Sequence, residues 1–327
     1  MDHKPTPVPM LLPMLLQTLR LPPALQARLA ASYTVHCLPD QPDPQAFLAA
    51  RGAEFHGLVT SAAVGANAAL INALPHLRVI SSFGVGLDKL DLAAARARGI
   101  AVGYTPDVLN DCVADLAFGL LLAAARGISA GDRFVRRGAW AGAGTPAMPN
   151  FGLGRKVSGA RLGILGLGRI GRTIARRASG FEMDVRYHSR RPVADVAWVH
   201  VPSLIELAAW ADYLVVIAAG GAATRHLVNA EVLEALGPQG FLINVARGSV
   251  IDEAALVRAL VDKRIAGAGL DVFENEPQVP AELMALDNVV LLPHIASATV
   301  ETRQAMADRV ADNLDAFFRG SALLSAA

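Results

Sequence analysis

The sequence predicts an α/β fold built from two parallel-sheet domains, and three observations indicate it. Short apolar runs alternate along the chain with alanine-rich amphipathic segments, which is typical of βα units. The alternation occurs in two series that meet near residue 106. The chain has 327 residues, of which 53% are hydrophobic and 18% are charged, so it is long enough for two domains with buried cores.

The first series occupies the N-terminal third of the chain. An apolar segment at 10–16, interrupted by Pro13, is expected to form a first strand and the residues that lead into it. Helices are expected at 68–73 and 90–98, where alanine-rich segments follow apolar runs. The remaining strands of this series are expected at 33–37, 57–60, 78–82 and 100–103.

The second series is clearer because local signals mark its helix starts. Ser203 to Glu206 has a capping-box pattern, and Asn229 and Asp252 are suited to cap the next two helices. A segment at 138–154, rich in Gly, Ala and Pro, predicts an irregular loop. Strands are expected at 161–165, 184–188, 198–201, 213–218, 240–245, 267–271 and 289–293.

The boundary between the domains is expected near 105–107. A long helix at 110–125 follows it, and the last helix, at 300–318, is expected to return to the first domain. The first domain would then be discontinuous, at 1–105 and 296–327, with a second domain at 106–295 inserted into it. Two segments would cross the hinge, which suits a cleft that closes on a substrate.

Composition excludes several classes of function. Thirty basic and 29 acidic residues give a formal net charge of +1, so neither a nucleic-acid nor a membrane partner is expected. Only Cys37 and Cys112 are present, so no CxxC motif or cysteine-rich metal cluster is possible and no metal is expected. The N-terminus lacks the features of a secretory signal, and the apolar stretch at 113–125 is too short to span a bilayer. These features favour a reducing cytoplasm.

The turn after the strand at 161–165 carries a dinucleotide-binding pattern, Gly166-Leu167-Gly168-Arg169-Ile170-Gly171. Gly166 would allow a tight turn, Gly168 would let the backbone approach a pyrophosphate, and Gly171 would let helix and strand pack closely. Arg169 and Ile170 open the helix, whose N-terminus would face the phosphates. A glycine-rich turn without a ligand is the alternative, but the flanking strand and helix favour a cofactor site.

The end of the next strand indicates which dinucleotide is bound. NAD sites usually place an Asp or Glu there, on the ribose diol. This chain instead has His188-Ser189-Arg190-Arg191, and the last three residues can hydrogen-bond to a 2′-phosphate that a carboxylate would repel. An exposed basic loop is the alternative. Because the acid is also missing, we expect NADP(H) to be preferred, with NAD(H) possible.

Three polar residues at the ends of later strands predict catalytic chemistry. Arg247 and His294 each end an apolar run, and Glu276 lies just past another, so all three should gather at the carboxyl edge of one sheet. Arg247 can clamp a carboxylate, His294 can donate a proton, and Glu276 can orient the imidazole. Each has a structural alternative: an ion pair, a core histidine and a solvated loop residue. Together with the nucleotide site they indicate hydride transfer to a small 2-keto acid.

Further candidates lie on neighbouring segments. The glycines at 82–88 could offer successive backbone N–H groups to an anion, or could form an ordinary turn from strand to helix. Leu58 lies near the end of the strand at 57–60 and could wall the substrate pocket. Asp271 could hold the nicotinamide edge, pair with Arg247, or serve the structure alone.

These residues resemble the D-2-hydroxyacid dehydrogenase family, and within it the NADPH-dependent hydroxypyruvate/glyoxylate and hydroxyphenylpyruvate reductases. The similarity covers nearly the whole chain from about residue 50. It includes the segments 79–89, 105–109, 135–140, 163–171, 268–273 and 289–294.

The resemblance implies two Rossmann-like or flavodoxin-like domains, the inserted one binding NADP(H), in a homodimer that reduces 2-keto acids to D-2-hydroxy acids. It implies Arg247, Glu276 and His294 as the catalytic set, and substrate binding by the backbone of Val85 and Gly86. It also places on the cofactor Thr224, Val245, Ala246, Asp271 and Ala296, besides the residues of the glycine turn and the basic loop.

The sequence departs from the family pattern at three places. Ala296 replaces a usual Gly close to the expected nicotinamide, and 218–221 lacks the usual Pro and Leu. Ala143 stands where some relatives have a second Trp, which would leave a roomier pocket. The substrate therefore stays open among glyoxylate, hydroxypyruvate and aryl pyruvates. An NAD-dependent dehydrogenase and a nucleotide-sensing protein of the corepressor type remain the alternatives.

Overall fold

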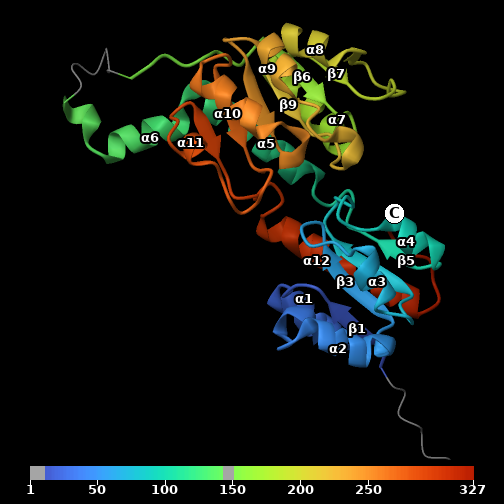
Figure 1. Cartoon of the computed structure of the whole chain (residues 1–327). Coiled ribbons are helices and arrows are strands. Elements are labelled where there is room, and N and C mark those ends of the chain that lie inside the picture. The colour runs from blue at the N-terminus through green and yellow to red at the C-terminus, as the bar shows by residue number, and fades with distance from the viewer. Residues whose placement is uncertain (1–11, 143–150) are drawn as a thin grey trace, which may run out of the picture. The chain divides into compact units, whose positions relative to one another are not determined.

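The computed structural model describes residues 12–142 and 151–327, which divide into two compact units (Figure 1). The first unit contains Met1–Val108 and Val300–Ala327. The second contains Leu109–Thr299, so it is inserted in the sequence between the two parts of the first.

A parallel sheet with the strand order β2-β1-β3-β4-β5 forms the centre of the first unit. This order is that of flavodoxin-like folds. The central strands β3 and β4 are buried at every residue, because helices cover both faces of the sheet. The strands are β1 (Met14–Gln17), β2 (Thr34–Cys37), β3 (Gly57–Ser61), β4 (Val79–Phe83) and β5 (Ala101–Gly103).

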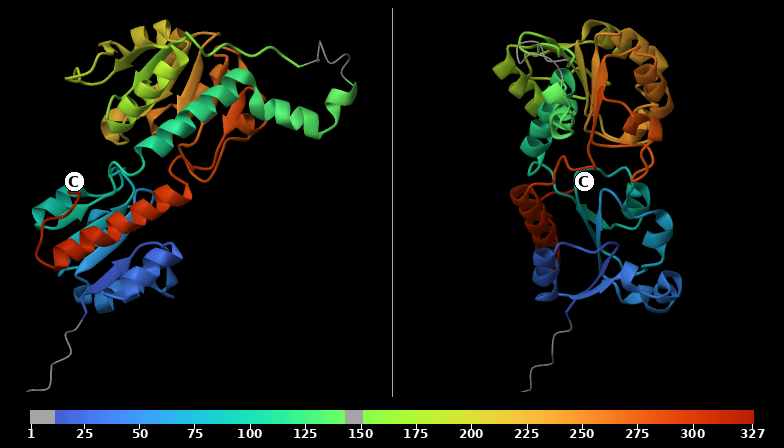
Figure 2. Two further views of the ribbon diagram at one scale, coloured as in Figure 1. Left: turned by 180° about the vertical axis from the view of Figure 1, so that it is seen from behind. Right: turned by 90° about the vertical axis from the view of Figure 1, so that its left-hand side faces the viewer.

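The helix α12 (Val300–Phe318) closes the first unit from the far end of the chain (Figure 2). It is fixed to β4 by the Ser81 hydroxyl, which donates to the carbonyl of Val310 at 3.0 Å. It is fixed to α1 by Arg28, which lies within 3.3 Å of carboxylate oxygens at 308, 312 and 315. The other helices of this unit are α1 (Pro23–Ala30), α2 (Pro44–Arg51), α3 (Ala68–Asn72) and α4 (Leu92–Ala97).

A parallel sheet with the order β12-β11-β10-β9-β6-β7-β8 forms the centre of the second unit. Counted from β6, this is the 3-2-1-4-5-6 order of dinucleotide-binding folds, extended by one strand. The strands are β6 (Arg161–Leu165), β7 (Asp184–His188), β8 (Val199–His200), β9 (Tyr213–Val216), β10 (Phe241–Asn244), β11 (Gly267–Leu270) and β12 (Val289–Leu291).

The predicted caps of the second unit are confirmed. Ser203 accepts the N–H of Glu206, Asn229 that of Val232, and Asp252 that of Ala255. The helices of this unit are α5 (Asn110–Arg126), α6 (Ile128–Arg136), α7 (Arg169–Ala178), α8 (Leu204–Trp210), α9 (Ala230–Leu236), α10 (Glu253–Val261) and α11 (Ala281–Met284).

Several predicted boundaries shift for identifiable reasons. The helix predicted at 90–98 begins at Leu92, because Asp91 caps it by accepting the N–H of Ala94 at 2.9 Å. The strand predicted at 198–201 is only Val199–His200, paired to β7 at the sheet edge. After α5 the chain forms a further helix, α6, which begins directly after Gly127 in the left-handed conformation (φ 62°).

Within the part of the chain that the structure describes, no single helix is long and apolar enough to cross a membrane. Only α5 and α6 together meet the length and composition, and they are bent by 62°. In the same residues, no group of three or more His, Cys, Asp or Glu side chains could hold a metal ion.

Candidate active site

The second unit brings together the three polar residues that the sequence singled out. Arg247 follows β10, Glu276 lies in the loop after β11, and His294 follows β12. These strands are neighbours and parallel, so their carboxyl ends lie along one edge of the sheet.

Glu276 and His294 form a direct pair. The Nδ1 atom of His294 lies 2.8 Å from Oε2 of Glu276, and Oε1 of Glu276 accepts the N–H of Phe273 at 3.1 Å. Burial raises the pKa of Glu276, but hydrogen bonds from His294 and Phe273 and the charges of His294 and Arg247 outweigh burial and lower it. An ionised Glu276 therefore accepts a hydrogen bond from the Nδ1–H of His294, which leaves Nε2 of the imidazole for chemistry.

Asp271 fixes the backbone that follows His294. It is completely buried at the end of β11, and its two carboxylate oxygens accept the N–H groups of Ile295 and Ala296 at 2.7 and 2.8 Å. Burial raises the pKa of Asp271, and these two bonds oppose that rise. His294 itself has a φ of 55°, a conformation that non-glycine residues adopt only where the surroundings impose it. Of the three roles open to Asp271, these contacts favour the structural one.

Arg247 is positioned by the side chain of Asn244, which ends β10. Asn244 Oδ1 accepts the N–H of Ala246, and Nδ2 donates to the carbonyl of Arg247, both at 3.0 Å. The guanidinium Nη1 donates to the carbonyl of Ala246 at 2.8 Å. The next residue, Gly248, lies against the backbone of 273–274, where a Cβ atom would overlap the carbonyl of Phe273. This close approach joins the Arg247 turn to the loop that carries Glu276.

A polar network behind these loops was not foreseen from the sequence. Glu274 accepts hydrogen bonds from Arg225 at 2.7 Å and His226 at 2.9 Å, and its own N–H donates to Glu253 at 3.1 Å. Burial raises the pKa of Glu253, opposed by the N–H of Glu274. In the sequence, Glu253 resembles an ordinary acid in the first turn of a helix, and Glu274 a solvated loop residue.

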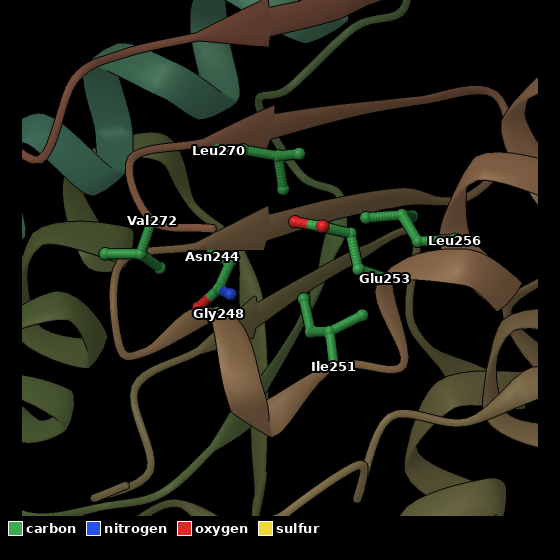
Figure 3. Close-up of a pocket in the computed structure, with 7 residues that line it drawn as sticks. All are labelled: Asn244, Gly248, Ile251, Glu253, Leu256, Leu270 and Val272. Atoms are coloured by element: carbon green, nitrogen blue, oxygen red, sulfur yellow. The ribbon is translucent and has the colours of Figure 1, made fainter. Parts of the chain in front are cut away.

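Glu253 also lines a small pocket beneath the Arg247 turn. Figure 3 shows its carboxylate pointing into the pocket, between Asn244 and Leu270. The pocket holds about 10 Å³, roughly the room that one water molecule needs. It is lined by Asn244, Gly248, Ile251, Glu253, Leu256, Leu270 and Val272.

The glycine turn between β6 and α7 has the geometry that a phosphate site requires. Gly166 has a φ of 100°, and a Cβ atom there would lie 2.8 Å from the nitrogen of Ala218. A Cβ atom at Gly171 would overlap the carbonyl of Gly166, so helix and strand pack closely. Around Gly168 the space is open. No side chain caps α7, which begins at Arg169 and Ile170, so its first N–H groups can hold an anion.

The loop after β7 presents two exposed cations. Arg190 and Arg191 are both exposed, and the Ser189 hydroxyl donates to the carbonyl of Arg191 at 2.7 Å. The Ser189 oxygen can still accept a bond, so two guanidinium groups and a hydroxyl lie on one short turn at the strand end.

The remaining expected cofactor residues lie on loops at the carboxyl side of the same sheet. The Thr224 hydroxyl donates within its loop, 2.7 Å from the carbonyl of Ala219 and 3.1 Å from that of Gly221. Val245, Ala246 and Ala296 are each 6% exposed. The carbonyl of Ala296 accepts from the thiol of Cys112 at 3.0 Å. Ala143 lies outside the described residues.

The expected substrate residues of the first unit differ in their surroundings. Val85 and Gly86 follow β4 and are partly exposed, next to Gly84 with a φ of 131°. Gly84 exchanges hydrogen bonds of 3.0 Å with Thr105, its N–H donating to the Thr105 hydroxyl and its carbonyl accepting the Thr105 N–H. Leu58 is completely buried in the core of this unit, because β3 continues past it to Ser61.

Comparison with known proteins identifies the family. Residues 118–296 match the model of the D-isomer specific 2-hydroxyacid dehydrogenase NAD-binding domain. The chain is 50% identical to hydroxyphenylpyruvate reductase of Plectranthus scutellarioides and 48% identical to a glyoxylate/hydroxypyruvate reductase of Arabidopsis thaliana, in each case over 87% of this chain and 89% of the relative.

A solved structure extends this similarity to the fold. The crystal structure of an NADPH-dependent glyoxylate/hydroxypyruvate reductase from Sinorhizobium meliloti, in complex with NADP and malonate, superposes with a TM-score of 0.89. It is 43% identical, and the match covers 96% of each chain. The sheet orders, the strand-end residues and these similarities agree, and the chain belongs to the D-isomer specific 2-hydroxyacid dehydrogenase family.

Proposed function

We propose that this protein is an NADPH-dependent reductase of small 2-keto acids, such as hydroxypyruvate, glyoxylate or an aryl pyruvate, and forms the D-2-hydroxy acid. The observation that carries the proposal is the 2.8 Å pair of Glu276 and His294 at the same sheet edge as Arg247. The names of the relatives support the substrate class, since they include reductases of each of these keto acids.

The residues of the second unit fit a dinucleotide. The pyrophosphate would lie over Gly168 and the uncapped start of α7, where the structure leaves space and N–H groups. Ser189, Arg190 and Arg191 would hold the 2′-phosphate, and Thr224, Val245, Ala246 and Ala296 would border the rest of the cofactor. The bound NADPH would supply a hydride to the keto carbon.

Each catalytic side chain has a task that its surroundings allow. Arg247 would bind the substrate carboxylate and polarise the keto oxygen, as a permanently charged fork whose turn Asn244 holds rigid. His294 would give its Nε2 proton to the keto oxygen as the carbon is reduced, so the product leaves as the neutral alcohol with its carboxylate intact. Glu276 would stabilise the imidazolium and fix its direction. The backbone of Val85 and Gly86 would also bind the substrate, as the resemblance to the family implies.

A steady-state assay tests the proposal. NADPH oxidation is followed with hydroxypyruvate, glyoxylate and 4-hydroxyphenylpyruvate, and each assay is repeated with NADH. Turnover of at least one keto acid with a clear preference for NADPH is expected. Turnover with NADH alone would overturn the cofactor assignment, and tight NADPH binding without any turnover would point to a nucleotide-sensing protein. The proposal includes that the protein is a homodimer and that it acts in the cytoplasm.

A further inference from the structure

Two histidines lock the ends of β7 and β8 to each other. His188 is the last residue of β7, and its Nδ1 lies 2.9 Å from the carbonyl of Val201, just beyond β8. His200 is the last residue of β8, and its Nε2 lies 3.0 Å from the carbonyl of Ser189, just beyond β7. The two rings stack, with centroids 6.3 Å apart and planes 15° apart. We call this reciprocal pair the histidine clasp.

The chemistry of the clasp sets the form of both rings. A carbonyl oxygen only accepts hydrogen bonds, so each bonded ring nitrogen carries its proton. His188 therefore holds its proton on Nδ1 and His200 on Nε2, and both rings point their donors at the backbone of the neighbouring strand end. The segment from His188 to Arg191 at this strand end contains no carboxylate of the kind that an NAD site would have there.

The clasp holds the turn that carries the two exposed arginines. The Ser189 carbonyl is fixed by His200, and its hydroxyl donates to the carbonyl of Arg191. The turn is closed at its far end by Val193, whose N–H donates to the Tyr187 hydroxyl at 2.9 Å. The Tyr187 ring in turn lies 5.2 Å from the ring of His200. Side chains of β7 and β8 thus fix both ends of the turn.

The backbone joins the ends of β7 and β8 over a short distance only. β7 is paired with β6 up to His188, but its pairing with the edge strand β8 covers two positions and is followed by one bond, from the N–H of Val201 to the carbonyl of Tyr187 at 2.8 Å. The clasp adds two side-chain bonds where this pairing ends. A long arginine side chain loses rotamer entropy when it is immobilised on a ligand. A turn that is already ordered lowers the further cost of aiming two such side chains at one phosphate.

We propose that His200, with His188, is a positioning residue that determines the preference for the 2′-phosphate by holding the Ser189–Val193 turn in its binding conformation. This inference rests on the proposed NADPH preference. It predicts that the clasp acts on ligands with a 2′-phosphate and leaves those without one unaffected.

Isothermal titration calorimetry of the full-length protein tests the inference without any turnover. Two fragments serve as probes: adenosine 2′,5′-bisphosphate, which has the 2′-phosphate, and 5′-AMP, which lacks it. His200→Ala is expected to weaken the bisphosphate about 3- to 10-fold, the effect of one or two lost hydrogen bonds, and to leave 5′-AMP unchanged. Val199→Ala, an exposed neighbour on the same strand, is the matched control and should change neither.

The outcomes separate this inference from the function on which it rests. If the wild-type protein binds 5′-AMP as tightly as the bisphosphate, the proposed NADPH preference fails. If the wild type prefers the bisphosphate and His200→Ala keeps the same ratio, the role of the clasp is overturned. Should His200→Ala fold poorly, His200→Gln and His188→Ala replace it in the test. The glutamine amide can donate to the Ser189 carbonyl, so His200→Gln is expected to retain the preference for the bisphosphate. His188→Ala is expected to reduce that preference.

Discussion

The Nδ1 atom of His294 lies 2.8 Å from Oε2 of Glu276, and the other oxygen of Glu276 accepts the N–H of Phe273. Both carboxylate oxygens are thus engaged by the two loops that follow β11 and β12. The imidazole is oriented by a group that is itself fixed to the backbone, so its direction does not depend on a bound substrate. A preoriented acid of this kind avoids reorganisation when a proton is transferred.

The Glu276–His294 pair makes the stability of the fold depend on pH. The folded pKa of Glu276 is lowered, because hydrogen bonds and nearby charges outweigh the opposing effect of burial. The pair therefore stabilises the fold above the unfolded pKa of about 4.3, and this contribution is lost as the pH falls through the folded value. We expect the difference in Tm between the wild type and Glu276→Gln to shrink from pH 7 to pH 3. The effect should be small, since the side chain is about one-third exposed.

Thermal unfolding over that pH range measures the difference. Glu234→Gln, which removes an exposed partner of Arg264, is the surface control. A Tm difference between wild type and Glu276→Gln that stays constant down to pH 3 would contradict the lowered pKa.

Arg247 is expected to be required for turnover and dispensable for cofactor binding. In Arg247→Ala, kcat/KM for a 2-keto acid should fall about 10- to 100-fold or more, the loss of a charged hydrogen bond to the substrate. Arg247→Lys should restore little, because an ammonium cannot form the two parallel bonds of a guanidinium. Fluorescence titration with NADPH supplies the second readout. Near-normal turnover in Arg247→Ala would sink the clamp assignment.

The arginines after β7 are expected to separate the two cofactors. The double variant Arg190→Ala with Arg191→Ala should raise KM for NADPH about 10-fold or more, since two charged bonds to the 2′-phosphate are lost. KM for NADH is the internal control and should stay within about twofold of the wild-type value. An equal loss for both cofactors would argue against a 2′-phosphate site on this turn.

The elements that the sequence predicted well are those with strong local signals. The parallel strands β9 and β12 are continuous apolar runs, and the turn at Gly166 requires a positive φ, so both were visible in the sequence. Glu276 and His294 could be paired in advance because the carboxyl ends of neighbouring parallel strands must lie together. That geometric rule needs only the order of the strands.

Other features depend on side chains that meet through tertiary packing. Nothing local distinguishes Glu253 from the exposed acid Glu231, which occupies the first turn of α9. The clasp between His188 and His200 required knowledge that a two-residue strand lies at the sheet edge. The complete burial of Leu58 likewise depends on the residues of other elements that pack against β3. Such features are decided by contacts between distant segments, which periodicity does not encode.

Asp271 is expected to control the loop of His294. Both of its oxygens accept backbone N–H groups, and an asparagine offers only one acceptor, so Asp271→Asn would turn an amide donor toward one of those N–H groups. We expect the free energy of unfolding to fall by about 1–3 kcal/mol, with kcat reduced as well. Urea unfolding and steady-state kinetics measure the two effects. Asp262→Asn, at an exposed position, is the control. If Asp271→Asn equals this control in both unfolding free energy and kcat, Asp271 does not control the loop of His294.

Glu253 is expected to act on catalysis through the loop that carries Glu276. Its carboxylate accepts the N–H of Glu274 at 3.1 Å from within the pocket beneath the Arg247 turn, so Glu253→Ala leaves that N–H without its partner. One lost hydrogen bond at this place should lower kcat about 3- to 10-fold while KM for the cofactor changes little. Glu253→Gln keeps an acceptor oxygen and should retain most of the activity. Glu231→Ala, the matched acid in the first turn of α9, should behave as wild type. If Glu253→Ala turns over as fast as Glu231→Ala, the Glu274 network does not support the catalytic loop.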